Sequence, residues 1–222
     1  MRSAIHHAAF TLAAVALSGS AVAQSGSPAE ATGFALTPYL GVLIPTAALL
    51  NIPKNGAAPS GAPLKLSAAI TVGARLGIGL GERIAIDVDV GYSPGSLEFD
   101  STGAKANQDV KVLSGSGRLT LYAIPRTSPV WLGVSAGVAG VRHTFSQNAT
   151  SAAGSGVQDG TNVGGVFGAS AGIRLGQLLA LNFGAEDYLY SATFDVNGAK
   201  TSERKQHDIH LTAGVRVPFL GF

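Results

Sequence analysis

Three short repeats in the chain place an arginine two residues after a glycine, and a fourth copy has serine in place of the glycine. They read Gly73-Ala74-Arg75-Leu76, Gly172-Ile173-Arg174-Leu175, Gly214-Val215-Arg216-Val217 and, as the variant, Ser116-Gly117-Arg118-Leu119. Residues two apart in a β-strand share a face, so each small residue and its arginine point the same way. We expect the small residue to leave room for the arginine, which can then pair with anions on one face.

Carboxylates on other segments supply the matching negative charge. Unpaired charge inside a narrow protein interior is costly, so charges that share an interior should form a hydrogen-bonded ionic network. The predicted network comprises Arg75, Asp87, Asp89, Arg118, Arg174, Glu186, Asp208 and Arg216. Its simplest interpretation is a polar plug; a gated narrow pore and a proton or ion relay are alternatives.

Other chemistry-bearing residues have spacings that do not suit a site. His207 and His210 are three apart, so on a strand they face opposite ways, and only Asp208 and His210 share a face. We expect these two to form a hydrogen-bonded pair rather than a metal site. The run Gly77-Ile78-Gly79-Leu80-Gly81 resembles part of a nucleotide loop, but no helical pattern follows it, and a hairpin turn explains it. We predict neither a metal nor a cofactor.

The elements that must position these residues are strands. Alternation of apolar and polar or small residues predicts eight of them. They span 34–45, 65–78, 83–93, 109–123, 129–144, 162–175, 178–194 and 206–219. The apolar parity changes within 109–123, which predicts a bulge near Leu113–Gly115. Asp187 falls on the apolar parity of its strand and is expected near a rim or after a bulge.

Long and short connections follow one another in rotation. Long gaps at 46–64, 94–108, 146–161 and 195–205 alternate with short turns near Gly79–Glu82, Ile124–Pro129 and Gly176–Gln177. Tight turns at one rim and long loops at the other are typical of membrane barrels of the bacterial outer-membrane kind.

Composition favours the same class. The chain is 46% hydrophobic and only 13% charged, whereas soluble domains carry about twice that charge. After the amino-terminal segment no run of 18 apolar residues predicts a membrane helix, and only helices and closed barrels satisfy their backbone in lipid. The formal net charge of +2 and the absence of cysteine indicate neither a nucleic-acid footprint nor disulfides. We predict an all-β fold, an eight-stranded antiparallel up-and-down transmembrane β-barrel.

The amino-terminal segment is typical of a secretory signal peptide. A basic start precedes the apolar run Ala8–Leu17, and Ala21-Val22-Ala23 supplies a small-x-small cleavage pattern. We therefore divide the chain into a signal peptide (1–23), a linker (24–33) and a barrel (34–222). A lone amino-terminal membrane helix is the alternative. An even strand number places both termini in the periplasm and the long loops outside.

Residues near the predicted strand ends suit the two membrane interfaces. Arg142 and His143 are expected to contact lipid phosphates in the outer leaflet. Aromatic side chains gather near the strand ends, as in interfacial girdles. They are Phe34, Tyr122, Trp131 and Phe219 at one end, and Tyr92, Phe145, Tyr190 and Phe194 at the other.

Over residues 34–219 the chain resembles the small eight-stranded outer-membrane barrels of OmpA and OmpX type. The resemblance rests on the segment Pro38-Tyr39-Leu40-Gly41-Val42, the Gly-x-Arg repeats, and the final segment from His207 to Phe219. The resemblance implies a location in the bacterial outer membrane, contact with its lipids, and an aromatic-ended last strand read by the barrel-insertion machinery. His143, Thr144 and Ser146 also loosely resemble the His/Ser/Glu site of outer-membrane lipid A deacylases. A straight strand would put His143 and Ser146 on opposite faces, and no glutamate follows nearby.

The expected role is structural or surface-interaction, without catalysis, and no surface partner can be identified from the loops. Three alternatives stay open: a narrow channel, an outer-leaflet lipid-modifying enzyme, and a soluble periplasmic barrel of lipocalin type. The last would bury the apolar face of each strand and expose the polar one.

Overall fold

Eight long strands dominate the computed structural model, which describes residues 32–51, 63–101, 104–146, 158–176, 178–196, 199–200 and 203–221. The long strands are β1 (Thr32–Pro45), β4 (Ala69–Leu80), β5 (Ile84–Ser101), β6 (Ala104–Ile124), β7 (Val130–Phe145), β8 (Gly160–Arg174), β9 (Ala180–Ala192) and β12 (Arg204–Gly221). Short strands β2 (Ala48–Asn51), β3 (Pro63–Leu66), β10 (Asp195–Val196) and β11 (Ala199–Lys200) lie in the connections.

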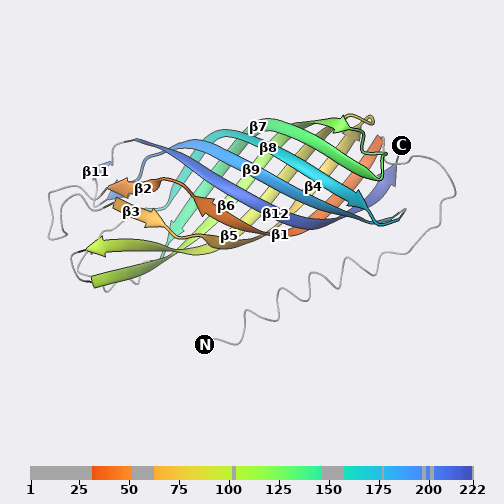
Figure 1. Cartoon of the computed structure of the whole chain (residues 1–222). Helices are drawn as coiled ribbons and strands as arrows, with labels where there is room; N and C mark the ends of the chain where they lie inside the picture. The colour runs from red at the N-terminus through yellow and green to blue at the C-terminus, as the bar shows by residue number, and fades with distance from the viewer. Residues whose placement is uncertain are drawn as a thin grey trace.

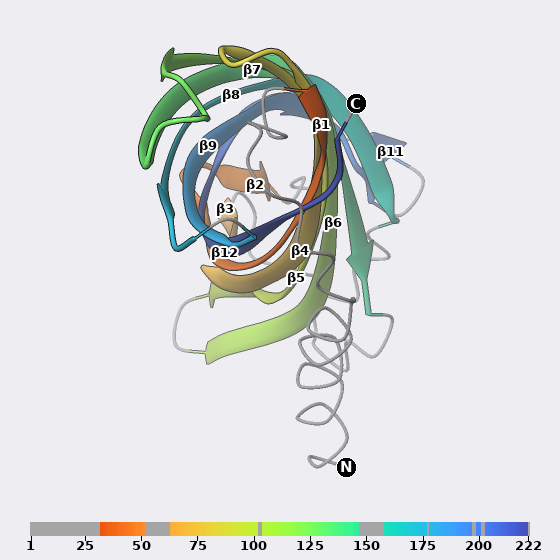
Figure 2. The same ribbon diagram turned by 90° about the vertical axis from the view of Figure 1, so that its right-hand side faces the viewer.

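The long strands close into a ring. Neighbours follow the order β5-β4-β1-β12-β9-β8-β7-β6, and β6 pairs with β5 to complete the circle. Every pairing is antiparallel, including that between the first and last strands, which runs from Gly33↔Gly221 to Pro45↔Asp208. Figure 2 shows the ring along its axis. Closure leaves no free edge along the ring, and the predicted eight-stranded antiparallel barrel is confirmed.

The two ends of the barrel differ. We call the end with the three short turns, near Gly81, Pro125 and Gly176, the turn end, and the opposite end the loop end. Figure 1 shows the carboxyl terminus at the turn end and the β5–β6 hairpin projecting at the loop end. No helix of the described residues is long and apolar enough to cross a membrane.

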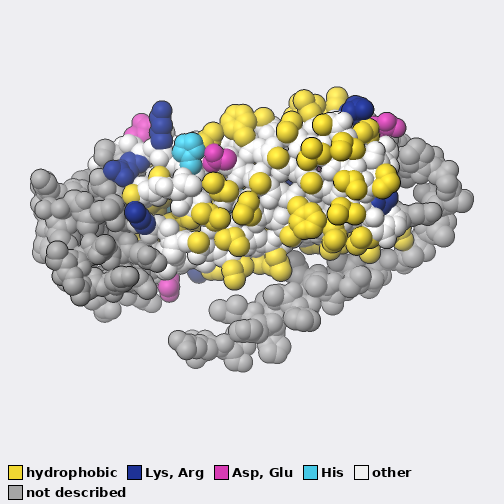
Figure 3. Space-filling view, viewed as in Figure 1, with side chains coloured by type: hydrophobic (Ala, Val, Ile, Leu, Met, Phe, Trp, Pro, Cys, Tyr) yellow, Lys and Arg dark blue, Asp and Glu magenta, His cyan; other side chains and the backbone are white. Residues whose placement is uncertain are grey.

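Apolar side chains face outward. Val88 and Val215 are 46% and 39% exposed, whereas Asp87 and Arg216 are only 5% and 8% exposed. On the face shown in Figure 3, yellow hydrophobic side chains are accordingly spread along the barrel wall, and charged side chains gather toward its ends. A lipocalin-type barrel needs the inverse arrangement, so the structure contradicts that alternative.

The predicted loop at 94–108 is wrong for most of its length. Strands β5 and β6 continue in register to Ser101↔Ala104, so residues 102–103 alone connect them. The gaps at 46–64 and 195–205 also contain strands, namely β2, part of β3, β10 and β11. The signal peptide 1–23 lies outside the described residues, and the predicted linker overlaps β1 at Thr32 and Gly33.

The predicted bulge near Leu113–Gly115 is also wrong. The β5–β6 register runs without a shift from Ile84↔Leu121 to Ser101↔Ala104. Val110 and Val112 are each 1% exposed and simply point inward, because the interior at this height is apolar. Apolar residues on the inner face of β6 thus imitate a change of parity in the sequence.

A register shift does occur where the barrel closes. Phe34 pairs with Leu220 and Ala35 with Pro218, which leaves Phe219 as an extra residue on β12. Its ring is 51% exposed and lies 6.0 Å from that of Phe34. These two aromatic rings therefore lie together at the turn end, where the sequence predicted them.

Candidate functional site

Four charged side chains meet inside the barrel, and we call them the central charged layer: Arg75 on β4, Asp89 on β5, Arg118 on β6 and Glu186 on β9. Arg75 Nε lies 3.2 Å from Asp89 Oδ2, and its Nη2 contacts Glu186 Oε1. Arg118 Nη1 lies 2.5 Å from the same Glu186 oxygen, and its Nη2 lies 3.8 Å from Asp89 Oδ2. Each charge therefore faces two of opposite sign.

The layer spans the lumen from wall to wall. In the ring, β9 lies four strands from β5 in either direction, so Glu186 projects from the wall opposite Asp89. The four side chains are 1–6% exposed and their formal charges cancel. Tyr39 on β1 adds a hydrogen bond, its Oη donating to Asp89 Oδ1 at 2.9 Å. Pairing of opposite charges offsets part of the cost of burying them, and every charge of the layer is paired, although Arg118 Nε has no hydrogen-bond partner.

A second polar group lies nearer the turn end. Thr120 donates a hydrogen bond to Asp87. Asp87 Oδ1 and Arg216 Nη1 both face Gly77, 2.9 and 3.4 Å from the point where a Cβ would lie. The structure therefore places Asp87 and Arg216 close together, but not within the central charged layer.

The alternation of the strands missed Arg126, which enters the lumen from the turn after β6. It is 3% exposed, its guanidinium lies 5.5 Å from the centre of the Tyr122 ring, and its backbone N–H donates to Glu82 O at 3.0 Å. A turn residue has no strand parity from which its direction could be predicted. Among the residues that the structure describes, the buried arginines are Arg75, Arg118, Arg126 and Arg216, and the buried carboxylates are Asp87, Asp89, Glu186 and Asp208.

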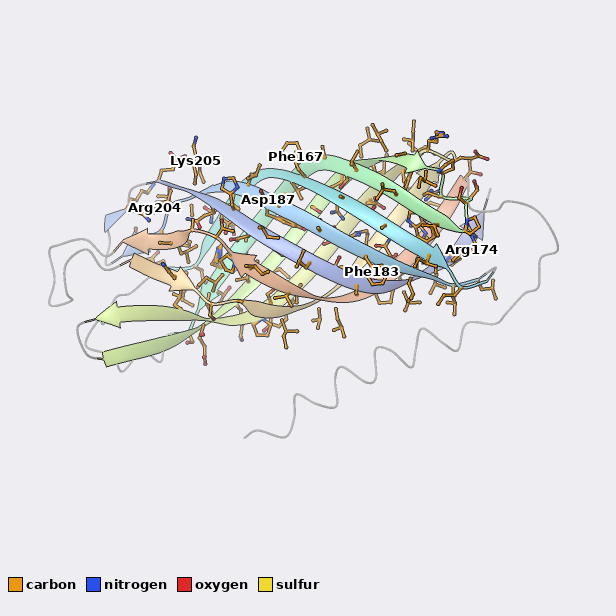
Figure 4. The ribbon with its side chains drawn as sticks, in the orientation of Figure 1. Phe167, Arg174, Phe183, Asp187, Arg204 and Lys205 are labelled. Atoms are coloured by element: carbon orange, nitrogen blue, oxygen red, sulfur yellow. The ribbon has the colours of Figure 1, made fainter. Side chains whose placement is uncertain are left out.

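Arg174 lies apart from the central charged layer. It is partly exposed at the turn end of β8, where its Nη2 donates to Arg126 O at 2.7 Å. Figure 4 labels it at that end of the barrel. The prediction that all four repeat arginines join one network is therefore wrong for Arg174, because Arg174 lies six residues nearer the turn end than Gly168, the residue that pairs with Glu186.

The glycines of the repeats leave room for aromatic rings. A Cβ on Gly172 would overlap the ring of Trp131, and one on Gly73 would overlap Tyr39. Trp131 and Tyr122 are 2% and 5% exposed and pack inside the turn end. The prediction that these two aromatics form an interfacial girdle is wrong, since both point inward.

The loop-end half of the interior is mainly apolar. Its buried cluster comprises Leu43, Leu49, Leu66, Ala69, Leu97, Val110, Val112, Ala139, Val141, Phe145, Val166, Tyr188, Tyr190, Ala192 and Phe194. Phe145, Tyr190 and Phe194 were expected in the outer girdle and instead face inward, whereas Tyr92 is 37% exposed and faces outward. The expected polar plug thus occupies only part of the barrel.

Asp208 lies in this half and accepts a hydrogen bond from Tyr190 Oη at 2.6 Å. His210 packs against Tyr188, with ring centroids 4.4 Å apart and ring planes tilted by 31°. The expected pairing of Asp208 with His210 is not what the structure shows, because a tyrosine on the neighbouring strand satisfies the carboxylate.

The structure separates Arg142 from His143. Arg142 faces outward with its side chain 58% exposed and lies 3.9 Å from Asp159. His143 is 0% exposed; its Nε2 lies 3.5 Å from Tyr190 Oη, and its ring meets that of Phe194 edge-on at 5.6 Å. The prediction that His143 contacts lipid is wrong, because successive strand residues point to opposite faces.

The two histidines of β12, His207 and His210, lie on opposite sides of the barrel wall and cannot ligate one metal ion. His207 is on the outer surface, 3.2 Å from Asp187, whereas Asp208 and His210 are inside. Within the described ranges no group of three or more His, Cys, Asp or Glu residues could hold a metal ion. Asp187 lies on the outer face without a bulge, as the rim alternative predicted.

Comparison with known proteins identifies the fold. No protein-family model and no curated protein matches the sequence. Among solved structures, the outer membrane protein OprG from Pseudomonas aeruginosa matches 87% of this chain and 99% of its own, with 13% identity and a TM-score of 0.65. AlkL matches 90% and 96%, with 17% identity and a TM-score of 0.58. Neisserial surface protein A matches 85% and 99%, with 15% identity and a TM-score of 0.55. At these identities the likeness is one of fold, that of the small outer-membrane barrels.

Proposed function

We propose that the chain is an integral protein of the bacterial outer membrane with a structural or surface-interaction role and no catalytic activity. The observation that carries this proposal is the combination of an apolar outer wall with a lumen crossed by the central charged layer. The wall suits lipid, and the layer opposes an open aqueous pore.

The outer wall offers acyl chains an apolar surface. Large apolar side chains at least 37% exposed include Leu40, Val42, Ile70, Ile86, Val90, Leu119, Leu132, Val138, Phe167, Phe183 and Leu211. Such a surface would be an aggregation hazard in water. Outer-membrane lipids are thus the proposed surroundings, and the barrel-insertion machinery is the proposed partner of the last strand during assembly.

The surface role rests on the loop end. Strands β5 and β6 stay paired for nine residue pairs beyond Tyr92↔Leu113, out to Ser101↔Ala104. At about 3.4 Å per residue, this hairpin reaches roughly 30 Å past that level. One solved structure of similar fold is named a surface protein, which agrees with this proposal without identifying a partner.

Location is tested by substituting a lipid-facing residue. Val134 lies on the outer wall of β7 and is 60% exposed. We expect Val134→Arg to lower the free energy of unfolding in phospholipid vesicles by about 2–4 kcal/mol, because arginine at the bilayer midplane is costly. Thr144→Arg, ten residues along the same outer face, should cost about 1 kcal/mol or less. Equal, small effects would contradict a lipid-embedded wall, as would recovery of the chain outside outer-membrane fractions.

The channel alternative has a direct test. Glu186 bridges Arg75 and Arg118 across the lumen, so its removal is the change most suited to opening a path. We expect neither the wild type nor Glu186→Ala to conduct in planar bilayers, because the apolar loop-end cluster still fills the interior above the layer. Steps of conductance in the wild type would overturn the closed lumen, and steps in the variant alone would show that the layer is the gate.

The lipid-enzyme alternative has little support in the geometry. His143 faces the lumen among Tyr190 and Phe194, whereas Ser146 Oγ donates to Asp109 O at 3.1 Å. A serine hydrolase needs its nucleophile and base within hydrogen-bond reach. Altered lipid A on overexpression of the chain would contradict a non-catalytic role.

A further inference from the structure

A groove of about 390 Å³ lies in the barrel wall at the loop end, between β8, β9 and β12. Apolar residues Val163 and Leu189 line one part of it, and Lys205 and His207 line another. A volume of this size falls within the range of small-molecule pockets. The groove therefore joins an apolar surface to cationic groups.

An interruption in the strand ladder creates the groove. The β8–β9 pairing ends at Gly164↔Tyr190, although β8 continues to Gly160, which still pairs with His143 of β7. On the other side, β9 stays paired with β12 as far as Ala192↔Arg204. The first four residues of β8, 160–163, thus lie outside the pairing with β9, and Gly164, where that pairing begins, packs closely on the Leu189 carbonyl oxygen.

The groove lies where the outer wall changes from apolar to cationic. Along the outer face of β12, Leu211 and Ile209 are followed by His207 and then Lys205 toward the loop end. Val163, on the adjoining β8, is 76% exposed. The same change of surface occurs where acyl chains give way to headgroups at a bilayer interface.

Two cationic side chains, Lys205 and His207, are among the described residues that line the groove. His207 lies 3.2 Å from Asp187, so that carboxylate faces the histidine. Lys205 is exposed and makes no ion pair with any residue of the described ranges. Figure 4 shows Asp187, Arg204 and Lys205 together toward this end of β9 and β12.

We propose that this groove binds a phosphorylated acyl lipid of the outer leaflet, with the phosphate on Lys205 and an acyl chain along Val163 and Leu189. The proposal rests on the proposed membrane location and adds a specific lipid site. A free phosphate would use only the lysine, whereas the groove offers apolar contact directly beside it. A lysine near the membrane surface attracts anionic lipid headgroups, and Lys205 is placed to do so.

The test measures binding of lipid A to the purified, folded barrel in detergent micelles by titration calorimetry. We expect Lys205→Ala to weaken binding about fivefold to tenfold, and Lys205→Arg to bind nearly as the wild type does. Lys111→Ala is the matched control, because Lys111 is also exposed near the loop end, on β6, away from the groove. It should change binding less than twofold. Heat-modifiable migration on gels verifies that each variant is folded.

Three results would overturn the site. Lys205→Ala could bind lipid A as tightly as the wild type does. Alternatively, Lys205→Ala and Lys111→Ala could weaken lipid A binding equally, which would indicate only nonspecific electrostatic attraction. Glucosamine 6-phosphate, which has a phosphate but no acyl chain, could also bind as well as lipid A. The membrane location is judged separately, by fractionation of cells. Chain found outside the outer membrane that still bound lipid A through Lys205 would refute the location and support the site.

Discussion

Glu186→Ala is expected to lower the free energy of unfolding by about 3–5 kcal/mol, because removing one partner of a buried ion network leaves an uncompensated charge. Glu186 is 4% exposed and is the shared partner of Arg75 and Arg118. Without it, two arginines face the single carboxylate of Asp89, and the central charged layer carries an excess positive charge.

The measurement is urea unfolding in phospholipid vesicles, followed by the fluorescence of Trp131, the one tryptophan of the chain. Glu82→Ala, at an exposed turn residue, is the control and should change stability by no more than about 0.5 kcal/mol. The double variant Glu186→Ala, Arg118→Ala restores neutrality and should lose less than the single variant. A double variant that loses the sum of both single effects would contradict the coupling.

Gly172→Ala should destabilise the barrel by roughly 1–3 kcal/mol or more, the usual cost of overpacking a filled interior. Gly172 on β8 pairs with Trp131 on β7, and an added Cβ would overlap the indole ring. The ring is 2% exposed and is packed against Ala85, Tyr122 and Ala180. It therefore cannot move without displacing its neighbours.

Gly117→Ala provides the matched control, since nothing described lies within 4 Å of its added Cβ. We expect that variant to unfold as the wild type does or slightly later. Trp131 fluorescence should shift in Gly172→Ala and stay unchanged in Gly117→Ala. Equal stability of the two glycine variants would show that the tryptophan ring adapts, and the close packing of this pair would then be unimportant.

The alternation of residues determined much of the architecture. Period-two patterns predicted eight strands and the face of each, including inward Arg75 and outward Val88, because side-chain direction on a strand is a local property. Strand parity also assigned Asp87, Asp89 and Glu186 to the interior. The low charge of the chain and the apolar face of each strand predicted a barrel whose apolar side chains face outward.

Only the tertiary structure determined which charged side chains contact one another and how far along the barrel they lie. Which arginine meets which carboxylate depends on barrel closure, which sets β9 opposite β5 and lets Glu186 reach Arg118. The entry of Arg126 follows from the path of a turn, for which no periodic pattern exists.

The same reason explains the errors of prediction. Val110 and Val112 predict a bulge only if every apolar residue faces outward, yet the loop-end interior is apolar as well. His143 was assigned to the lipid interface although its position on the strand directs it inward. Sequence alternation specifies which side of a strand a residue occupies, whereas the closed three-dimensional register specifies what it meets there, because those contacts join residues distant in the chain.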